Sequence, residues 1–284
     1  MNAIEINGLC KKYTDFELDN ISFQVPSGAI MGFVGENGAG KTTTIKAMLN
    51  LIKKDSGSIQ ILGMDSEQYE KEWKEQTGVV FDENCFPEVM NAKEIEKLME
   101  QIYKKWDSPL YEKYLKDFEI DSKKIIQNYS KGMKMKLSIA VALAHHAQLL
   151  ILDEATSGLD PIVREEILDI FRDFIQDENH TVFLSSHIIS DLDKIADYIT
   201  FIHKGKLIFC KDKEELLQQY KILKCSKEEL KSIEQSHIVA VRENSFGVEA
   251  LIDNGRDFKS SSYVVDESTL EDIILLTVKG KSVE

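Results

Sequence analysis

Cysteine is scarce in this chain of 284 residues, and its four cysteines show no metal-binding or redox spacing. Cys10, Cys85, Cys210 and Cys225 are far apart in the sequence, so they form no CxxC pair and no cysteine and histidine cluster suited to zinc. We therefore expect reduced thiols of the kind that persist in a cytosol.

The chain also lacks a hydrophobic run long enough to span a membrane, which takes about 18 or more apolar residues. The longest candidate, LSIAVALAHHAQLLIL, is interrupted by His145, His146 and Gln148. The N-terminus has no basic stretch followed by an apolar one, as a secretion signal would have. We expect neither a membrane span nor a secretion signal, and hence a cytoplasmic protein.

Positive charge is under-represented, with 35 basic against 49 acidic residues and a net charge of −14 at pH 7. Nucleic-acid binding needs many Lys and Arg contacts to phosphate, so this balance predicts no nucleic-acid partner. Hydrophobic residues make up 43% of the chain, which is enough for one large or two modest globular domains.

Short β-strands are predicted within the first sixty residues. The segments AIEING, LDNISFQV and GSIQIL are apolar at every second position, with turns at VPSG and KDSG. Residues 29–34, AIMGFV, are continuously apolar, which is typical of a strand buried on both faces of a parallel sheet. This strand leads directly into a glycine-rich loop and then into KTTTIKAMLNLI, which we predict to be a helix.

From Ala92 to Asp121 the pattern becomes helical. Apolar residues recur at three- and four-residue steps in a charged background: Ile95, Leu98, Met99, Ile102 and Tyr103. Strands return at LLILDEA and HTVFLSS, separated by a helix that has Pro161 in its first turn. This βαβ order predicts a parallel sheet with functional residues at its strand ends. YITFIHKGKLIF predicts a hairpin that turns at Lys204 and Gly205.

Beyond about Leu217 the pattern changes again. KEELKSIEQ reads as a short helix, HIVAVREN and FGVEALIDNG as strands, and TLEDIILLTVKG as an amphipathic helix. We therefore predict a main domain at residues 1–217, with a helical subdomain at about residues 85–148, and an accessory α+β domain at residues 218–284. No neighbouring segment reads as large enough to bury the last helix, so we expect a dimer contact there. A regulatory module and a packing extension are the alternatives.

GENGAGKT fits the P-loop pattern, with a buried strand before it and a helix after it. Gly35, Gly38 and Gly40 allow the backbone to turn its N–H groups towards phosphate oxygens. Lys41 can reach the terminal phosphates, and the hydroxyl of Thr42 suits Mg²⁺. This motif predicts a nucleotide-binding site.

Two further strand ends carry polar residues suited to phosphate chemistry. LLILDEA ends in Asp153, which can hold the metal through water, and in Glu154, which can polarise an attacking water. LSSH ends in His187, which we place near the terminal phosphate. Both motifs are common by themselves, and they gain meaning from their order after the P-loop.

A second anion site is predicted in YSKGM, where Ser130 and Gly132 lie at a helix start whose N–H groups point outwards. One triphosphate already occupies the P-loop. If this second half-site lies on the far side of the molecule, it must complete the nucleotide site of a second subunit, which implies a dimer. An ordinary N-cap serine is the alternative.

Together, GENGAGKT, YSKGM, LLILDEATSGLDP and LSSH resemble the nucleotide-binding subunit of ATP-binding cassette (ABC) transporters, over roughly residues 4–217. The resemblance implies an α/β P-loop NTPase fold with a RecA-like, mostly parallel sheet, an antiparallel β subdomain and an inserted α-helical subdomain. It also implies an ATPase that binds ATP and Mg²⁺ and dimerises head to tail, as a homodimer or with a related ATPase. Separate integral-membrane permease subunits would hold it at the inner face of the cell membrane.

By position, the resemblance implies contacts to phosphate and metal from Lys41, Thr42 and Thr43, with Asp153 on the metal and Glu154 as general base. The other P-loop residues, Glu36, Asn37 and Ala39, belong to the same cradle. Across the dimer, the resemblance implies that Ser130 and Gly132 contact the opposing terminal phosphate and that Asp160 lies in a communicating loop. His187 matches the residue that senses the phosphate, and Tyr13 the aromatic residue that stacks on adenine. For Tyr13, a place in the core is the alternative.

Three features of the sequence depart from the pattern of the family. Asp82 stands where glutamine is usual and could still reach Mg²⁺ or a water, so we expect altered metal dependence or slower activation. The signature, usually LSGGQ, has Tyr129, Lys131 and Met133 around the retained Ser130 and Gly132. Ala155 replaces a usual proline, a change for which the sequence offers no interpretation.

In its overall sequence, the cassette is most similar to those of bacterial subfamilies that work with exporter-type permeases. These permeases handle peptides, antibiotics or other amphipathic substrates. An uptake-type cassette would share every catalytic residue and remains an alternative. An ABC ATPase without a transport function is a further alternative, although two cassettes in one chain or a long coiled coil, together with a basic surface, would then be expected.

Overall fold

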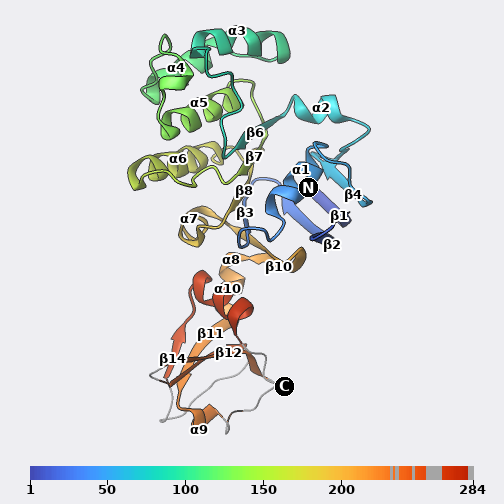
Figure 1. Ribbon diagram of the computed structural model, residues 1–284, viewed down its shortest axis with the longest axis vertical. Helices are drawn as coiled ribbons and strands as arrows, with labels where there is room; N and C mark the ends of the chain where they lie inside the picture. The colour runs from blue at the N-terminus through green and yellow to red at the C-terminus, as the bar shows by residue number, and fades with distance from the viewer. Residues whose placement is uncertain (231–232, 234–236, 245–246, 254–263, 281–284) are drawn as a thin grey trace. The chain divides into compact units, whose positions relative to one another are not determined.

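Parallel strands of continuously apolar sequence form the centre of the first part of the chain (Figure 1). All residues of β3 and β7 are buried, as expected for strands covered on both faces. The order in the sheet is β10-β9-β3-β8-β7-β6, and the pairs from β9 to β6 are parallel. The strands are β3 (Ile30–Val34), β6 (Thr77–Phe81), β7 (Leu149–Asp153), β8 (Thr181–Ser186), β9 (Tyr198–His203) and β10 (Lys206–Asp212). The predicted parallel sheet is confirmed.

The structure is a computed structural model that describes residues 1–230, 233, 237–244, 247–253 and 264–280. It divides into two units, Met1–Cys210 and Lys211–Glu284. Each is described by itself below.

A second, antiparallel sheet completes the strands of the first unit, in the order β2-β1-β4-β5. Its strands are β1 (Asn2–Lys12), β2 (Glu17–Pro26), β4 (Ser56–Ile61) and β5 (Met64–Asp65). The main core joins the two sheets, and Phe23 of β2 stacks on Phe183 of β8 with ring centroids 5.9 Å apart. Phe33 of β3 lies 5.3 Å from Phe183, so aromatic packing fixes β3 and β8 against the second sheet.

Four helices of the first unit begin at a side-chain cap. Asn91 starts α3 with a capping box, Asp107 caps α4, Ser130 caps α5 and Asp160 caps α6. α3, α4 and α5 pack together (Figure 1), and α5 also packs on β6. The helices are α1 (Lys41–Met48), α2 (Glu70–Lys74), α3 (Ala92–Ile102), α4 (Ser108–Asp117), α5 (Lys131–Leu143), α6 (Pro161–Phe174) and α7 (Ile189–Ile195), with a 3-10 turn at Ile126–Asn128.

α1 is shorter than predicted, because it ends at Met48 rather than continuing to Ile52. Asn50 adopts a φ of 57°, a left-handed conformation that asparagine tolerates and that commonly ends helices. The N–H of Leu51 then donates to the carbonyl of Lys46 at 2.9 Å, which closes the last turn. As a result, Leu51 leaves the helix and is 55% exposed.

In the second unit, α10 (Leu270–Lys279) packs on β12 (Ile238–Asn244) and β13 (Gly247–Asp253). Leu270, Ile273, Ile274 and Leu276 are all buried. The expectation that no local surface could bury this helix is therefore wrong, and with it the basis for a dimer contact there. The sheet is larger than predicted because it also contains β11 (Tyr220–Cys225) and β14 (Val264–Glu267), in the order β12-β13-β11-β14.

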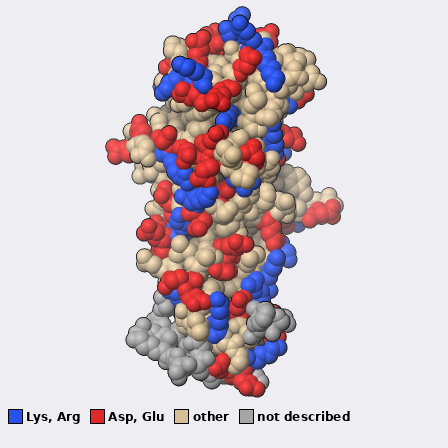
Figure 2. All heavy atoms as spheres, turned by 90° about the vertical axis from the view of Figure 1, so that its left-hand side faces the viewer, with Lys and Arg blue, Asp and Glu red and all other residues tan. Residues whose placement is uncertain are grey.

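The remaining elements of this unit are α8 (Lys213–Gln219) and α9 (Lys227–Leu230). Parts of the predicted helix KEELKSIEQ and of the predicted strand FGVEALIDNG lie outside the described residues. On the face drawn in Figure 2, acidic and basic side chains are interspersed over the described residues.

Candidate active site

The glycine-rich loop connects β3 to α1 and closes around the ammonium group of Lys41. A Cβ on Gly35 would come within 2.5 Å of the carbonyl oxygen of Ile202, so only glycine fits there. Gly40 precedes α1 with a φ of 113°. Lys41 is 5% exposed, and its Nζ donates to the carbonyl oxygens of Gly35 at 2.7 Å and Glu36 at 3.3 Å. The loop is thus tied to the lysine that follows it.

The parallel register brings the ends of β3, β7 and β8 to one edge of the sheet, because Val34 pairs with Ser186 and Asp153 with Ser185. Asp153 is buried and accepts a hydrogen bond from the Ser185 hydroxyl at 2.7 Å. The next residue, Glu154, has a φ of 56°, which large side chains rarely adopt without support from their surroundings.

Glu154 lies between the two other residues that we predicted to be catalytic. Its Oε1 is 3.0 Å from Nζ of Lys41, and its Oε2 is 2.6 Å from Nδ1 of His187. The backbone N–H of His187 also donates to Oε2 at 3.4 Å. The structure therefore brings Lys41 together with Glu154 and His187, although more than a hundred residues separate Lys41 from either of them in the sequence.

Phosphate and Mg²⁺ fit this edge of the sheet by the chemistry of its groups. α1 begins at a glycine and has no side-chain cap, unlike α3 to α6, so its first N–H groups can serve an anion. No group of three or more His, Cys, Asp or Glu among the described residues is arranged to hold a metal by itself. Mg²⁺ usually needs only one or two protein ligands beside substrate phosphates, so the Thr42 hydroxyl and Asp153 suffice.

The other residues of the loop differ in exposure. Glu36, Asn37 and Gly38 are exposed, whereas Ala39 is buried and its N–H donates to the Glu36 carbonyl at 3.0 Å. Thr42 is exposed and Thr43 half-buried in the first turn of α1. Tyr13 is 45% exposed, with Nζ of Lys11 5.5 Å from its ring centroid.

A second group of predicted residues lies where α5 and α6 begin. Ser130 accepts a hydrogen bond from the N–H of Met133 at 3.2 Å, which is the N-cap role that we kept as the alternative. Gly132 is buried, and a Cβ there would approach Val163 of α6 to 2.9 Å. Asp160 caps α6 by accepting from the N–H groups of Ile162 and Val163, both at 3.1 Å. The starts of the two helices are thus in direct contact.

An ion pair that the sequence did not predict joins two of the positions that depart from the family pattern. Nζ of Lys131 donates to Oδ1 of Asp82 at 2.6 Å. The residues are 49 positions apart in sequence, and the only signal was that both differ from the usual residue.

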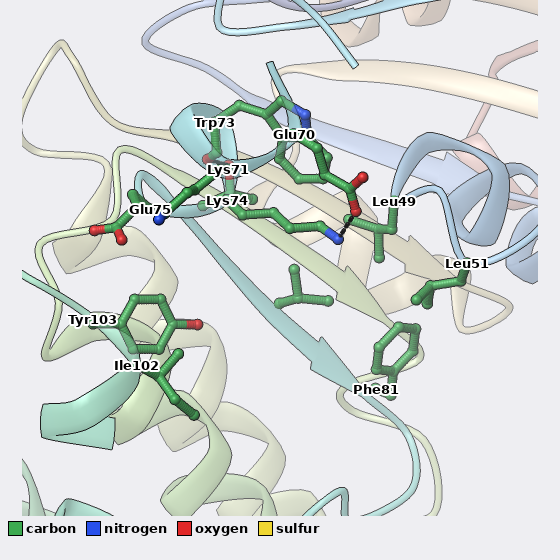
Figure 3. Close-up of a pocket in the computed structure, with 12 residues that line it drawn as sticks. Leu49, Leu51, Glu70, Lys71, Trp73, Lys74, Glu75, Phe81, Ile102 and Tyr103 are labelled. Carbon is green, nitrogen blue, oxygen red and sulfur yellow. Dashed lines mark hydrogen bonds and ion pairs between the residues drawn. The ribbon is translucent and has the colours of Figure 1, made fainter. Parts of the chain in front are cut away.

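A groove of about 590 Å³ lies beside β6, lined mostly by apolar side chains (Figure 3). Phe81 and Leu51 lie on one side of it, and Ile102 and Tyr103 on the other. Trp73 is fully buried and donates from its indole N–H to the Ser66 carbonyl at 2.9 Å. The ion pair between Lys74 and Glu70 adds charge to the lining. The sequence predicted Ile102 as part of a helical stripe but not that it is 53% exposed in a groove.

The fold and the cluster of Lys41, Glu154 and His187 define a P-loop nucleotide-binding protein of the α/β class. Comparison with known proteins agrees with this class. A family model described as ABC transporter matches residues 18–157. The bacitracin transport ATP-binding protein BcrA of Bacillus licheniformis is 36% identical over 72% of this chain and 68% of its own length. The lantibiotic transport ATP-binding protein SrtF of Streptococcus pyogenes is 35% identical over 74% of this chain and 90% of its own.

Solved structures show the same fold. An ATP-binding subunit of an ABC transporter superposes with a TM-score of 0.69 at 25% identity, over 76% of this chain and 92% of that one. An ATP-binding cassette in a dimeric post-hydrolysis state with ADP and Pi gives a TM-score of 0.66 at 19% identity, over 74% and 98% of the two chains. This chain belongs to the ABC transporter family as an ATP-binding, ATP-hydrolysing subunit. Among the described residues, no helix is both long and apolar enough to cross a membrane.

Proposed function

We propose that this chain is the ATPase subunit of an exporter that moves a peptide, an antibiotic or another amphipathic substrate through separate membrane subunits. The names of the relatives support the substrate class, because BcrA is a bacitracin transport protein and SrtF a lantibiotic transport protein. The match to SrtF covers 90% of that protein, so nearly all of the relative has a counterpart here.

The observation that carries the proposal is the position of Glu154 between Lys41 and His187, with contacts of 3.0 Å and 2.6 Å. A carboxylate held in this way is suited to accept a proton from an attacking water, and His187 is suited to orient it. Lys41 would exchange the carboxylate for phosphate oxygens. MgATP, when bound, supplies the phosphoanhydride bond to be cleaved and the charge that attracts the second subunit.

For the nucleotide, we assign the backbone of Gly35–Gly40 with Lys41, Thr42 and Thr43 to the phosphates, and Tyr13 to the adenine. Thr42 and Asp153 would hold Mg²⁺, with Asp82 as an additional carboxylate. The uncapped start of α1 and the half-exposed Tyr13 support these assignments.

For assembly, we propose a head-to-tail dimer in which Ser130, Gly132 and Asp160 approach the nucleotide of the partner subunit. Direct packing of Gly132 on Val163 supports this arrangement, because it makes the start of α5 and the start of α6 one continuous surface. The partner is a second copy of this chain or a related ATPase.

The groove beside β6 is the proposed attachment point for the membrane subunits, which would keep the chain at the inner face of the cell membrane. Its apolar lining, with Phe81, Leu51 and Ile102, fits an apolar side chain from an amphipathic segment of the permease. The charged pair of Lys74 and Glu70 could fix the orientation of that segment.

The substitution Glu154→Gln tests the role of the carboxylate. We expect ATP hydrolysis to fall by at least roughly 100-fold, since removal of a general base typically costs that much. Nucleotide binding should persist, because glutamine keeps the size of the side chain and releases Lys41. With MgATP, the variant should sediment as a dimer, whereas the variant without nucleotide should sediment as a monomer.

Glu112→Gln is the matched control, since Glu112 is exposed on α4 away from the strand ends. It should hydrolyse ATP within about two-fold of the wild type. Unchanged hydrolysis in Glu154→Gln would contradict the assigned base. Binding of MgATP without dimer formation would contradict a homodimer.

A further inference from the structure

The start of α5 carries positive charge that its own helix does not balance. Lys131 and Lys134 lie in its first turn, and that turn has no acidic residue. The positive end of the helix dipole disfavours cations at this position. The negative charge comes instead from the loop after β6, where Asp82 is 2.6 Å from Nζ of Lys131 and Glu88 is 2.7 Å from Nζ of Lys134.

Of these two pairs, Asp82 and Lys131 lie among the residues assigned to nucleotide chemistry. Lys131 is flanked by Ser130 and Gly132, which the proposed function places on the partner's phosphate. Its Nζ also lies 3.2 Å from the position that a Cβ on Gly158 would take. Lys131 therefore contacts both the loop after β6 and the loop that leads into α6.

We propose that the ion pair between Asp82 and Lys131 is a latch, which opens when Lys131 binds the terminal phosphate held by the partner's P-loop. The proposal rests on the proposed head-to-tail dimer. Opening leaves Asp82 free to turn towards the Mg²⁺ site of its own chain. One lysine would thus couple nucleotide in one subunit to the metal-binding loop of the other.

Because the pair is exposed to solvent, breaking it costs little free energy. The side chains of Lys131 and Asp82 are 46% and 45% exposed, and such surface pairs shift an equilibrium by only about five-fold or less. A triphosphate carries more negative charge than a carboxylate and accepts several charge-assisted hydrogen bonds. Lys131 should therefore bind the phosphate in place of Asp82 once the two subunits associate.

In this scheme, the two departures from the family pattern, Asp82 and Lys131, balance each other's charge. A lysine in the signature would be an unbalanced charge at a helix start without a nearby anion, and Asp82 supplies one at 2.6 Å. An aspartate at position 82 that turned towards the phosphates would otherwise repel them. Each substitution is neutralised by the other until the dimer closes.

The test measures MgATP-dependent self-association of the full chain by sedimentation velocity in the Glu154→Gln background. Adding Lys131→Ala should weaken the dimer by about tenfold or more, as expected for loss of a hydrogen bond to a charged group. Adding Asp82→Asn should tighten it by roughly two- to five-fold, since the latch no longer competes for the lysine. Binding of a fluorescent ADP analogue to the monomer should be unchanged by Lys131→Ala.

Lys134→Ala is the matched control, because it removes the neighbouring pair with Glu88 and should change dimer affinity by less than about two-fold. The charge-swapped variant, Asp82→Lys with Lys131→Asp, tells whether the pair acts as a latch or only as a structural contact. It restores an ion pair but places a carboxylate opposite phosphate, so we expect its dimer to be at least as weak as that of Lys131→Ala.

The outcomes distinguish this inference from the proposed function. If the Glu154→Gln chain binds MgATP and remains monomeric, the proposed homodimer fails and the latch fails with it. If that chain dimerises and Lys131→Ala dimerises equally well, the latch alone is overturned. Wild-type affinity in the charge-swapped variant would also overturn it, since the pair would then be only a structural contact.

Discussion

At the scale of single residues, opposite charges hold the side chains of Lys41 and Glu154 together. Lys41 and Glu154 are 5% and 14% exposed, so their ion pair lies in a region where water screens charge poorly. Removal of one partner from a buried pair leaves the other charge without compensation, which is more costly than loss of a surface pair. The two residues that we propose to be catalytic therefore also stabilise the fold.

We expect Lys41→Met to lower the free energy of unfolding of the nucleotide-free chain by roughly 3 kcal/mol. The double variant with Glu154→Gln should lose less than the sum of the two single variants, because the two residues are in contact. Urea unfolding of the four chains measures this coupling. Lys46→Met, on the exposed face of α1, should change stability by under about 0.5 kcal/mol. Strict additivity would show that the ion pair contributes nothing.

The residues of this site were largely predictable from their motifs, but their contacts were not. The P-loop and the strand ends identify Lys41, Glu154 and His187 because each follows an apolar run of recognisable length. The contact of Glu154 with the two other side chains depends on its φ of 56°, and the pattern of apolar residues carries no information about that angle. The pair of Asp82 and Lys131 depends in the same way on how two loops meet.

At the scale of elements, α5 connects the proposed dimer surface at its start with the groove at its end. His145 follows α5, and its ring stacks on Tyr103 with centroids 4.0 Å apart. Its Nδ1 lies 3.1 Å from the Val141 carbonyl oxygen. Tyr103 lines the groove, so the buried histidine supports one wall of it.

Burial lowers the pKa of His145 below its ordinary value of 6.5, because the charged imidazolium is poorly solvated there. Its contribution to stability is therefore complete above about pH 6.5 and decreases as the pH falls, since the unfolded chain then binds the proton more tightly. We expect His145→Phe, which preserves the stack, to reduce the loss of stability between about pH 7 and 5.5. Urea unfolding at both pH values measures it.

His146→Phe is the control for that experiment, because the side chain of His146 is 55% exposed. It should keep the decrease in stability at low pH that the wild type shows. Equal pH dependence in the wild type and His145→Phe would contradict the role assigned to burial.

Element prediction failed where the signal was short. β14 has only four residues and β11 only six, so neither gives a sustained alternation of apolar and polar residues. Their omission made the predicted sheet too small, although α10 packs on β12 and β13, which were both predicted. By contrast, β3, β7 and β8 were evident because burial on both faces makes nearly every residue apolar or small, with Asp153 at the end of β7 as the exception.

At the scale of the whole molecule, the chain has two separate hydrophobic cores. One joins the two sheets of the first unit, and the other lies within the second unit around Leu223, Ala250 and Ile252. Nucleotide would bind only the first unit. It should therefore stabilise that unit alone, whereas a core substitution in the second unit should destabilise only the second unit.

We expect differential scanning calorimetry of the full chain to show two transitions. Ile273→Ala, at a fully buried position of α10, should lower one of them, since such a substitution costs roughly 2–5 kcal/mol. MgATP should raise only the other. A single transition that responds to both changes would show that the two units unfold together.

Phe81 and Asp82 are consecutive residues at the end of β6, yet one lines the groove and the other pairs with Lys131. Their Cα atoms are held about 3.8 Å apart by one rigid peptide. If a permease segment displaced Phe81, Asp82 would therefore have to move with it. Mechanical force from the membrane would reach the charge pair across a single covalent link, with no long chain of relayed movements between them.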